Sequence, residues 1–178
     1  MDFKDSHYIK EILDFHLPRF SELPNIDLYM DQVLCIIETS LNIFSSEGDE
    51  KIITKSMINN YVKQRVIESP SKKHYKKFHV AYLIVISVLK RILSISEISN
   101  IINNQDCEVE EFYDIFCCEL ENSLKNTFLE QKNEEPQIAQ NIHHKILIAA
   151  TQAFANKVYV QKLIEFNMEE NINPKENI

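Results

Sequence analysis

The sequence predicts an all-α fold with a small β-wing, and three features support that prediction. The chain has 178 residues, of which 44% are hydrophobic, so it is long enough and apolar enough to bury a core. It contains a single glycine, Gly48, whereas folds rich in tight β-turns need several. Apolar residues recur at the spacing of one helical turn along most of the chain. These features together favour a mainly helical protein.

The first part of the chain is expected to hold a short helical extension, an extended connection and one longer helix. Residues 1–26 begin with an amphipathic stretch and continue through two prolines, which favour extended backbone in the residues before them. Apolar residues in segment 28–44 recur at intervals close to 3.6 residues, which predicts a helix with Asp27 as its N-cap. Residues 45–50 are polar and are expected to form a loop.

The next part is expected to form a helix followed by a basic wing. Thr54 is a favourable N-cap for a helix over 54–65, and an apolar stripe is expected to turn one side of that helix to the core. The stripe consists of Met57, Ile58, Tyr61 and Val62. Pro70 interrupts helical structure, so segment 66–78 is expected to form a hairpin with lysines at its tip and on its returning arm.

Four more helices are expected in the rest of the chain. Segment 79–92 is strongly apolar, and Ser94 or Ser96 is expected to cap a short helix after it. Segments 109–132 and 137–166 are then predicted to be long helices. An intramolecular antiparallel hairpin of these two helices, covering the N-terminal helix, is one arrangement that the sequence allows.

Charge is distributed unevenly along the chain. The net charge is −8, which taken alone points away from nucleic acid. Between Lys51 and Arg91, however, ten basic residues occur with one acidic residue, Glu68, giving a net charge of +9. The nine basic and 26 acidic residues elsewhere give −17. Such a basic block favours a surface that binds a polyanion locally.

The order helix, loop, helix, basic wing and apolar helix is typical of a winged helix-turn-helix, whose second helix enters the DNA major groove. Asparagine side chains there can pair with adenine, and lysines can reach guanine acceptors or phosphates. The candidate DNA-contacting residues are Lys55, Ser56, Asn59, Asn60, Lys63, Arg65, Lys72, Lys73, Tyr75, Lys76 and Lys77. We therefore expect double-stranded DNA as the partner and transcriptional regulation as the function.

The stretch from Met57 to Ile102 resembles the DNA-binding domain of MerR-type regulators. Four of their motifs have counterparts here: Thr-Leu-Arg-x-Tyr at 57–61, Gly-Leu-x-x-Pro at 66–70, where this chain is one residue longer, Tyr-Arg-x-Tyr at 75–78, and the apolar helices at 83–86 and 95–98. The resemblance implies that Asn59 and Lys76 contact DNA. This chain lacks the glycines of the MerR pattern and has Arg65 at the turn.

A second resemblance covers residues 17–103. The segments LPRFSELPNIDLYMDQV and TKSMINNYVK, with the lysine-rich wing, are similar to a bacterial family catalogued as domain of unknown function 1836. That resemblance implies no particular activity.

The predicted organisation is a DNA-binding domain over 1–103, a helical dimerisation or effector region over 104–168, and a flexible tail over 169–178. Regulators that bind two DNA half-sites are commonly dimers. In MerR-type proteins a long helix after the DNA-binding domain forms the contact between the two subunits. Helix 109–132 resembles it in position, so a homodimer through this helix is expected. A small-molecule effector pocket could form among Phe112, Phe116, Cys117, Phe154 and Tyr159.

The sequence gives no sign of an enzyme. One glycine cannot build a phosphate-binding loop, and no Ser/His/Asp or paired-carboxylate arrangement occurs. His143 and His144 are adjacent, so on a helix they point about 100° apart and are poorly placed for one metal ion. We expect no cofactor, no membrane contact and a cytoplasmic location. The alternative function is a helical adaptor whose basic face binds an acidic protein.

Overall fold

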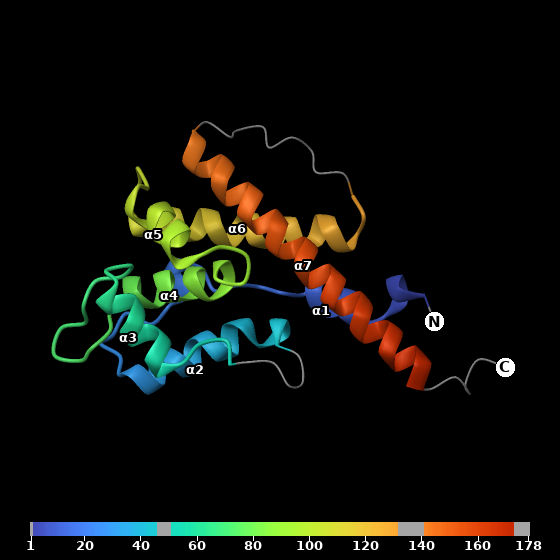
Figure 1. The fold of residues 1–178 in the computed structure, drawn as a ribbon, viewed down its shortest axis with the longest axis horizontal. Coiled ribbons are helices and arrows are strands. Elements are labelled where there is room, and N and C mark those ends of the chain that lie inside the picture. The colour runs from blue at the N-terminus through green and yellow to red at the C-terminus, as the bar shows by residue number, and fades with distance from the viewer. Residues whose placement is uncertain (1, 46–50, 132–140, 173–178) are drawn as a thin grey trace.

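The computed structural model describes residues 2–45, 51–131 and 141–172, and its architecture is mainly helical, as expected (Figure 1). Seven α-helices are present in this part of the chain: α1 (His7–Leu13), α2 (Met30–Leu41), α3 (Lys55–Lys63), α4 (Lys77–Leu89), α5 (Ile95–Asn103), α6 (Val109–Phe128) and α7 (Ile142–Ile172). Short 3-10 turns add η1 (Phe3–Asp5), η2 (Phe20–Glu22) and η3 (Asn42–Phe44). The predicted loop around Gly48 lies outside the described residues.

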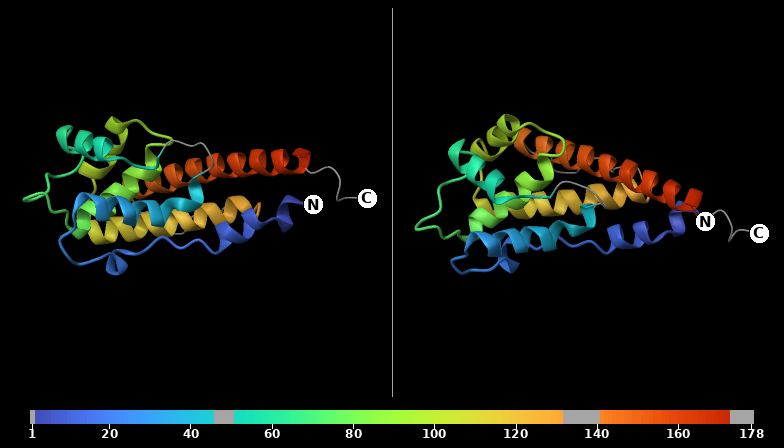
Figure 2. Two further views of the ribbon diagram at one scale, coloured as in Figure 1. Left: turned by 90° about the horizontal axis from the view of Figure 1, so that it is seen from below. Right: turned by 60° about the horizontal axis from the view of Figure 1, so that its bottom comes forward.

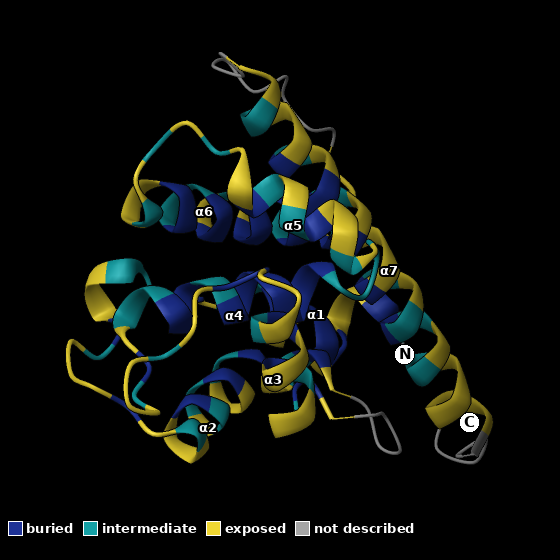
Figure 3. Ribbon diagram, turned by 60° about the vertical axis from the view of Figure 1, so that its left-hand side comes forward, coloured by how far each residue is buried: buried dark blue, intermediate teal, exposed yellow. Residues whose placement is uncertain are grey.

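Helix α4 forms the centre of the core. Nearly every residue from His79 to Leu89 is buried, because the helix lies between α2 on one side and α6 and α7 on the other (Figure 3). A helix that is apolar all round is stable only when it is enclosed in this way. The buried Ser87 hydroxyl is satisfied by donating to the Leu83 carbonyl oxygen at 2.7 Å. The predicted apolar helix is therefore the hub of the fold.

Helices α6 and α7 run in the same direction and cross each other, so the predicted antiparallel hairpin is wrong (Figure 1). Contacts between the two helices advance together along both: His144 bonds Glu119, Thr151 bonds Ser123, and Gln152 bonds Thr127. A tight turn after α6 would make α7 antiparallel to it. Residues 129–141 are instead numerous enough to connect the end of α6 to a helix that begins beside its start. Helix α6 is about 30 Å long, whereas 13 extended residues span about 43 Å.

An extended segment between α1 and α2 packs along α6. The Tyr113 hydroxyl donates to the Pro18 carbonyl oxygen at 2.8 Å, and the Phe20 amide donates to Asp114 at 2.7 Å. One hydrophobic core accordingly extends from Phe3 in η1 to Val158 in α7, across the predicted domain boundary at residue 103.

The ends of the helices follow local chemistry. Thr54 Oγ1 accepts the Met57 amide, so its predicted role as N-cap is confirmed. Ser94 rather than Ser96 caps α5, in a reciprocal pair with the Glu97 carboxylate. The predicted Asp27 cap is wrong: α2 is capped at Tyr29, whose amide donates to the Gln32 side chain. Helix α7 continues to residue 172, which is four residues into the predicted tail, and residues 173–178 lie outside the described part.

Candidate nucleic-acid interface

The two sides of α3 differ sharply in burial. Ile58 is fully buried and Tyr61 is 4% exposed, so one side of the helix packs on the core. The opposite side presents the polar residues predicted for it: Lys55, Ser56, Asn59, Asn60 and Lys63 are all exposed. Lys55 Nζ lies 2.5 Å from Asp31 Oδ1 of α2, a solvent-exposed ion pair that contributes little to stability. This polar side of α3 is called the α3 face below.

Helix α3 ends in a left-handed turn at Arg65, whose φ angle is 57°. The Arg65 amide donates to the Val62 carbonyl oxygen at 3.0 Å, and the Val66 amide donates to that of Tyr61 at 2.9 Å. This pair of bonds is the Schellman arrangement, in which the left-handed position is usually glycine. Arg65 thus holds the backbone conformation that a glycine would adopt more easily, and its side chain is exposed.

The predicted wing is reduced to a tight turn, and isolated bridges are the only β pairing among the described residues. Ser71 and His74 pair across the turn, with the His74 amide donating to the Ser71 carbonyl oxygen at 2.8 Å. The two central residues, Lys72 and Lys73, have φ angles of 50° and 67°. Positive φ at both central positions defines a turn that favours Asn-Gly. We call Ser71–His74 the lysine turn.

Two lysines in left-handed backbone cost stability that a glycine would not, by about 1–2 kcal/mol for each residue. Both side chains are exposed. Strained backbone of this kind is concentrated where side chains serve a function, because the surrounding structure must enforce it.

Tyr75 attaches the lysine turn to the core, and its side chain does not project into solvent. Its backbone amide donates to the Leu28 carbonyl oxygen at 2.8 Å, and the Leu28 amide donates back at 2.9 Å. The side chain is 3% exposed and its ring meets that of His79 edge-on. Burial also raises the pKa of the hydroxyl. Tyr75 therefore lies beneath the surface that the other predicted contact residues form.

The two lysines after Tyr75 have different surroundings. Lys76 is exposed and stands at the N-terminus of α4, where its amide donates to His79 Nδ1 at 2.9 Å. Lys77 is half-buried and turns toward η2: its ammonium lies 4.8 Å from the centre of the Phe20 ring and 3.4 Å from the Ser21 carbonyl oxygen. Lys76 thus extends the exposed basic surface, while Lys77 also holds the extended segment in place.

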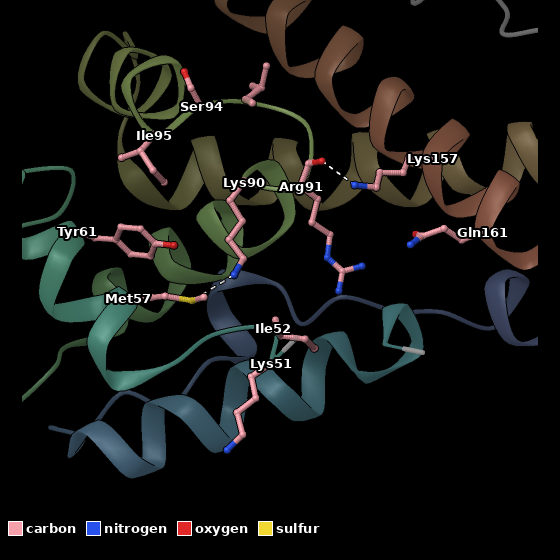
Figure 4. Close-up of a pocket in the computed structure, with 11 residues that line it drawn as sticks. Lys51, Ile52, Met57, Tyr61, Lys90, Arg91, Ser94, Ile95, Lys157 and Gln161 are labelled. Carbon is pink, nitrogen blue, oxygen red and sulfur yellow. Dashed lines mark hydrogen bonds between the residues drawn. The ribbon is translucent and has the colours of Figure 1, made fainter. Parts of the chain in front are cut away.

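The remaining basic residues of the block gather elsewhere. Lys51, Lys90 and Arg91 line a pocket of about 570 Å³ between α3 and α7, together with Lys157 of α7 (Figure 4). The Lys157 ammonium donates to the Arg91 carbonyl oxygen at 2.9 Å, and Lys90 Nζ lies 3.4 Å from Met57 Sδ. The block with net charge +9 is thus divided between the α3 face with the lysine turn and this pocket. Lys157 could not be assigned to the pocket from the sequence, because it lies 66 residues beyond Arg91.

The residues suggested for an effector pocket fill the core. Phe112 is 3% exposed, while Phe116, Cys117 and Phe154 are fully buried, and the Tyr159 hydroxyl lies 3.3 Å from a Glu130 oxygen. The apolar face of α6, through which a dimer was expected, is also buried within the chain. It consists of Phe112, Phe116, Leu120, Leu124 and Phe128.

Two absences hold for the described part of the chain. No group of three or more His, Cys, Asp or Glu side chains there could hold a metal ion. No helix there is both long enough and apolar enough to cross a bilayer.

Comparison with known proteins places the candidate residues within a family. No curated protein and no solved structure matches the chain. One family model matches residues 18–116, which is more than half of the chain and includes α2 to α5, the α3 face and the lysine turn. The chain belongs to the family described as Domain of unknown function (DUF1836).

Proposed function

We propose that the protein is a sequence-specific DNA-binding transcriptional regulator that uses the α3 face and the lysine turn. The observation that carries the proposal is the pair of exposed lysines held in left-handed backbone, together with a helix that has an exposed asparagine and lysine surface. Helix α3 and the lysine turn lie at the same end of the molecule (Figures 1 and 2).

The chemistry of the two elements is complementary. Asn59 and Asn60 can pair with the edge of adenine in the major groove, and Lys63 can reach guanine or a phosphate. Lys72, Lys73 and Lys76 suit the phosphates beside the groove, which position a protein without reading the sequence. The rest of the chain is acidic, so DNA would be repelled from its other surfaces.

The finer arrangement that we propose is a MerR-like winged helix-turn-helix. The left-handed turn at Arg65 supports it, because the backbone there has the conformation for which the MerR pattern uses glycine. In this arrangement α3 is the recognition helix and the lysine turn replaces the longer wing. Double-stranded DNA is the proposed partner, and a cytoplasmic location follows from the proposed function.

The proposal is tested by selecting a binding site from random duplexes and measuring its affinity by fluorescence anisotropy across salt concentrations. Replacing Lys72, Lys73 and Lys76 by Glu should weaken binding by at least 100-fold at low salt and reduce the salt slope by about three. Lys10→Glu, a change at an exposed residue of α1, is the control and should alter the affinity and the salt slope little.

Failure to select any sequence, or a triple variant with unchanged affinity and salt slope, would overturn the proposal. A purified stoichiometric complex with an acidic protein, and no retention of DNA, would favour the adaptor function instead.

A further inference from the structure

The pocket between α3 and α7 collects positive charge. It is the pocket drawn in Figure 4, and none of the described residues that line it is an aspartate or a glutamate. The whole chain has 27 acidic and only 19 basic residues, so a pocket with cations and no carboxylate in its described lining departs from the average of the molecule. A recess lined by one sign of charge concentrates the electric field and attracts the opposite sign. The pocket therefore favours a negatively charged ligand.

Three cations from two distant parts of the chain supply this charge. Lys90 and Arg91 follow the end of α4, and Lys157 of α7 lies 66 residues beyond Arg91. Lys90 and Arg91 are half-buried, so solvent screens their charges less than it screens those of fully exposed lysines. Lys51 also lines the pocket, but its ammonium points away from the other three side chains in Figure 4.

Contacts with neutral groups orient the three side chains. The Lys157 ammonium donates to the Arg91 carbonyl oxygen at 2.9 Å, and the Arg91 guanidinium donates to the Phe44 carbonyl oxygen at 2.7 Å. The Lys90 ammonium lies 3.4 Å from Met57 Sδ. A neutral acceptor orients a cation without cancelling its charge. Side chains that are oriented in this way lose less conformational entropy when a ligand binds.

The opposite wall of the pocket is largely apolar. Figure 4 shows Met57, Tyr61 and Ile95, which belong to α3 and α5, on one side of the pocket and Lys157 with Gln161 of α7 on the other. The volume is about 570 Å³, and pockets that hold small molecules measure roughly 300–1,000 Å³. A ligand that matches both walls has a charged group at one end and an apolar or aromatic group at the other.

We propose that this pocket binds a small organic phosphate. The phosphate group would lie against Lys90, Arg91 and Lys157, and the organic part against the apolar wall. Three cations suit a phosphate monoester, which carries a charge of about −1.5 to −2 at pH 7. Arginine bonds phosphate through paired N–H groups, and lysine adds a point charge. The start of α5 at this pocket is already capped by the Glu97 carboxylate, so the three cations supply the recognition.

Naphthyl phosphate is a probe that has both parts of the expected ligand. Added to the isotope-labelled full chain, it should shift the amide NMR signals of Leu93, Ser94 and Gln161, which line the pocket. The shifts should saturate with a dissociation constant of the order of 0.1–1 mM, as the size of the probe allows. Inorganic phosphate lacks the aromatic part and naphthol lacks the charge, so each should bind at least about 10-fold more weakly.

A variant of one cation tests the assigned residues. Lys157→Met removes one charge from the pocket and should weaken the binding of naphthyl phosphate by about 10-fold. Lys157 is exposed, so circular dichroism should show an unchanged helical content. The matched control is Lys145→Met, which makes the same change at an exposed residue of the same helix, outside the pocket lining. It should leave the dissociation constant unchanged.

Four results would overturn the inference. They are the absence of saturable shifts at the pocket residues up to about 10 mM probe, shifts confined to the lysine turn, equal affinity for naphthyl phosphate and either of its two fragments, and equal effects of Lys157→Met and Lys145→Met. No DNA is present in these titrations, so their outcome is independent of the proposed function.

Discussion

The Arg19 guanidinium donates two hydrogen bonds to the Glu121 carboxylate, of 2.8 Å to Oε1 and 2.7 Å to Oε2. The carboxylate also accepts the Leu17 amide at 2.9 Å, and Glu121 is 9% exposed. Arg19 lies inside the segment that matches the family model, whereas Glu121 lies on α6 beyond the end of that segment. The part of the chain that matches the family model is thus hydrogen-bonded to a residue outside that part.

Replacing Glu121 by Gln should destabilise the protein by about 2 kcal/mol. The change removes the charge that balances Arg19 in a mostly buried site, and the loss is smaller than for a fully buried pair because Arg19 retains some contact with water. Urea unfolding followed by circular dichroism measures it. Glu110→Gln, on the exposed side of α6, should change the free energy of unfolding by less than about 0.5 kcal/mol. Equal effects of the two changes would contradict this role for the pair.

The contribution of Glu121 should depend on pH. Burial raises the pKa of this carboxyl, but the Arg19 guanidinium and the Leu17 amide outweigh burial and hold the pKa below its ordinary value. The unfolded chain therefore binds a proton first, near the ordinary pKa of about 4.3, and the stabilisation is lost as pH falls through the lower pKa of the folded state. The stability difference between wild type and Glu121→Gln should be constant above about pH 5 and shrink below pH 4. A difference that grows on acidification would reverse the assigned direction.

Local features of the sequence predicted local structure well. Thr54 as an N-cap, the apolar helix at the centre of the core and the polar side of α3 all follow from helical periodicity and capping chemistry, which act over a few residues. The relative direction of α6 and α7 and the Arg19–Glu121 pair could not be predicted in this way. Each depends on contacts between residues that lie far apart in the sequence, for which a single chain carries no periodic signal. The left-handed lysines were missed because residue preferences alone would place Asn-Gly there.

The lysine turn should lower the free energy of unfolding, compared with a turn whose residues favour the same left-handed backbone. Changing Lys72 to Asn and Lys73 to Gly supplies the residues that this turn favours. The free energy of unfolding should rise by about 1–2 kcal/mol, which is less than the summed strain of the two lysines because glycine loses more conformational entropy on folding. The same variant should bind a selected DNA duplex more weakly, with a salt slope lower by about two. Thermal unfolding and anisotropy titration measure the two effects. If stability did not rise, the strain assigned to the lysines would be absent; if affinity held, the turn would not contact phosphate.

His79 should make the protein sensitive to mild acid. Burial lowers the pKa of its imidazole, and its neutral Nδ1 accepts the Lys76 amide at the start of α4. The folded state thus disfavours the proton more than the unfolded chain does. The stabilisation is present above the unfolded pKa of about 6.5 and is lost as pH falls through the lower folded value. Glutamine accepts the same bond without titrating, so stability of His79→Gln should fall less than that of wild type between pH 7.5 and 5.5. Parallel pH profiles would show that His79 does not titrate in this range.

Substitutions at Asn59 and Lys63 should distinguish base recognition from phosphate contact on the α3 face. Both side chains are exposed, one turn apart on the same helix. If Asn59 pairs with adenine, Asn59→Ala should cost about 1–3 kcal/mol on the selected duplex and relax the preference at one base position. Lys63→Ala should weaken all duplexes alike and lower the salt slope by about one if Lys63 binds phosphate. Affinity for a panel of single-base variants distinguishes the two patterns. A uniform loss from Asn59→Ala would mean that the α3 face positions the protein on DNA without reading the sequence at that residue.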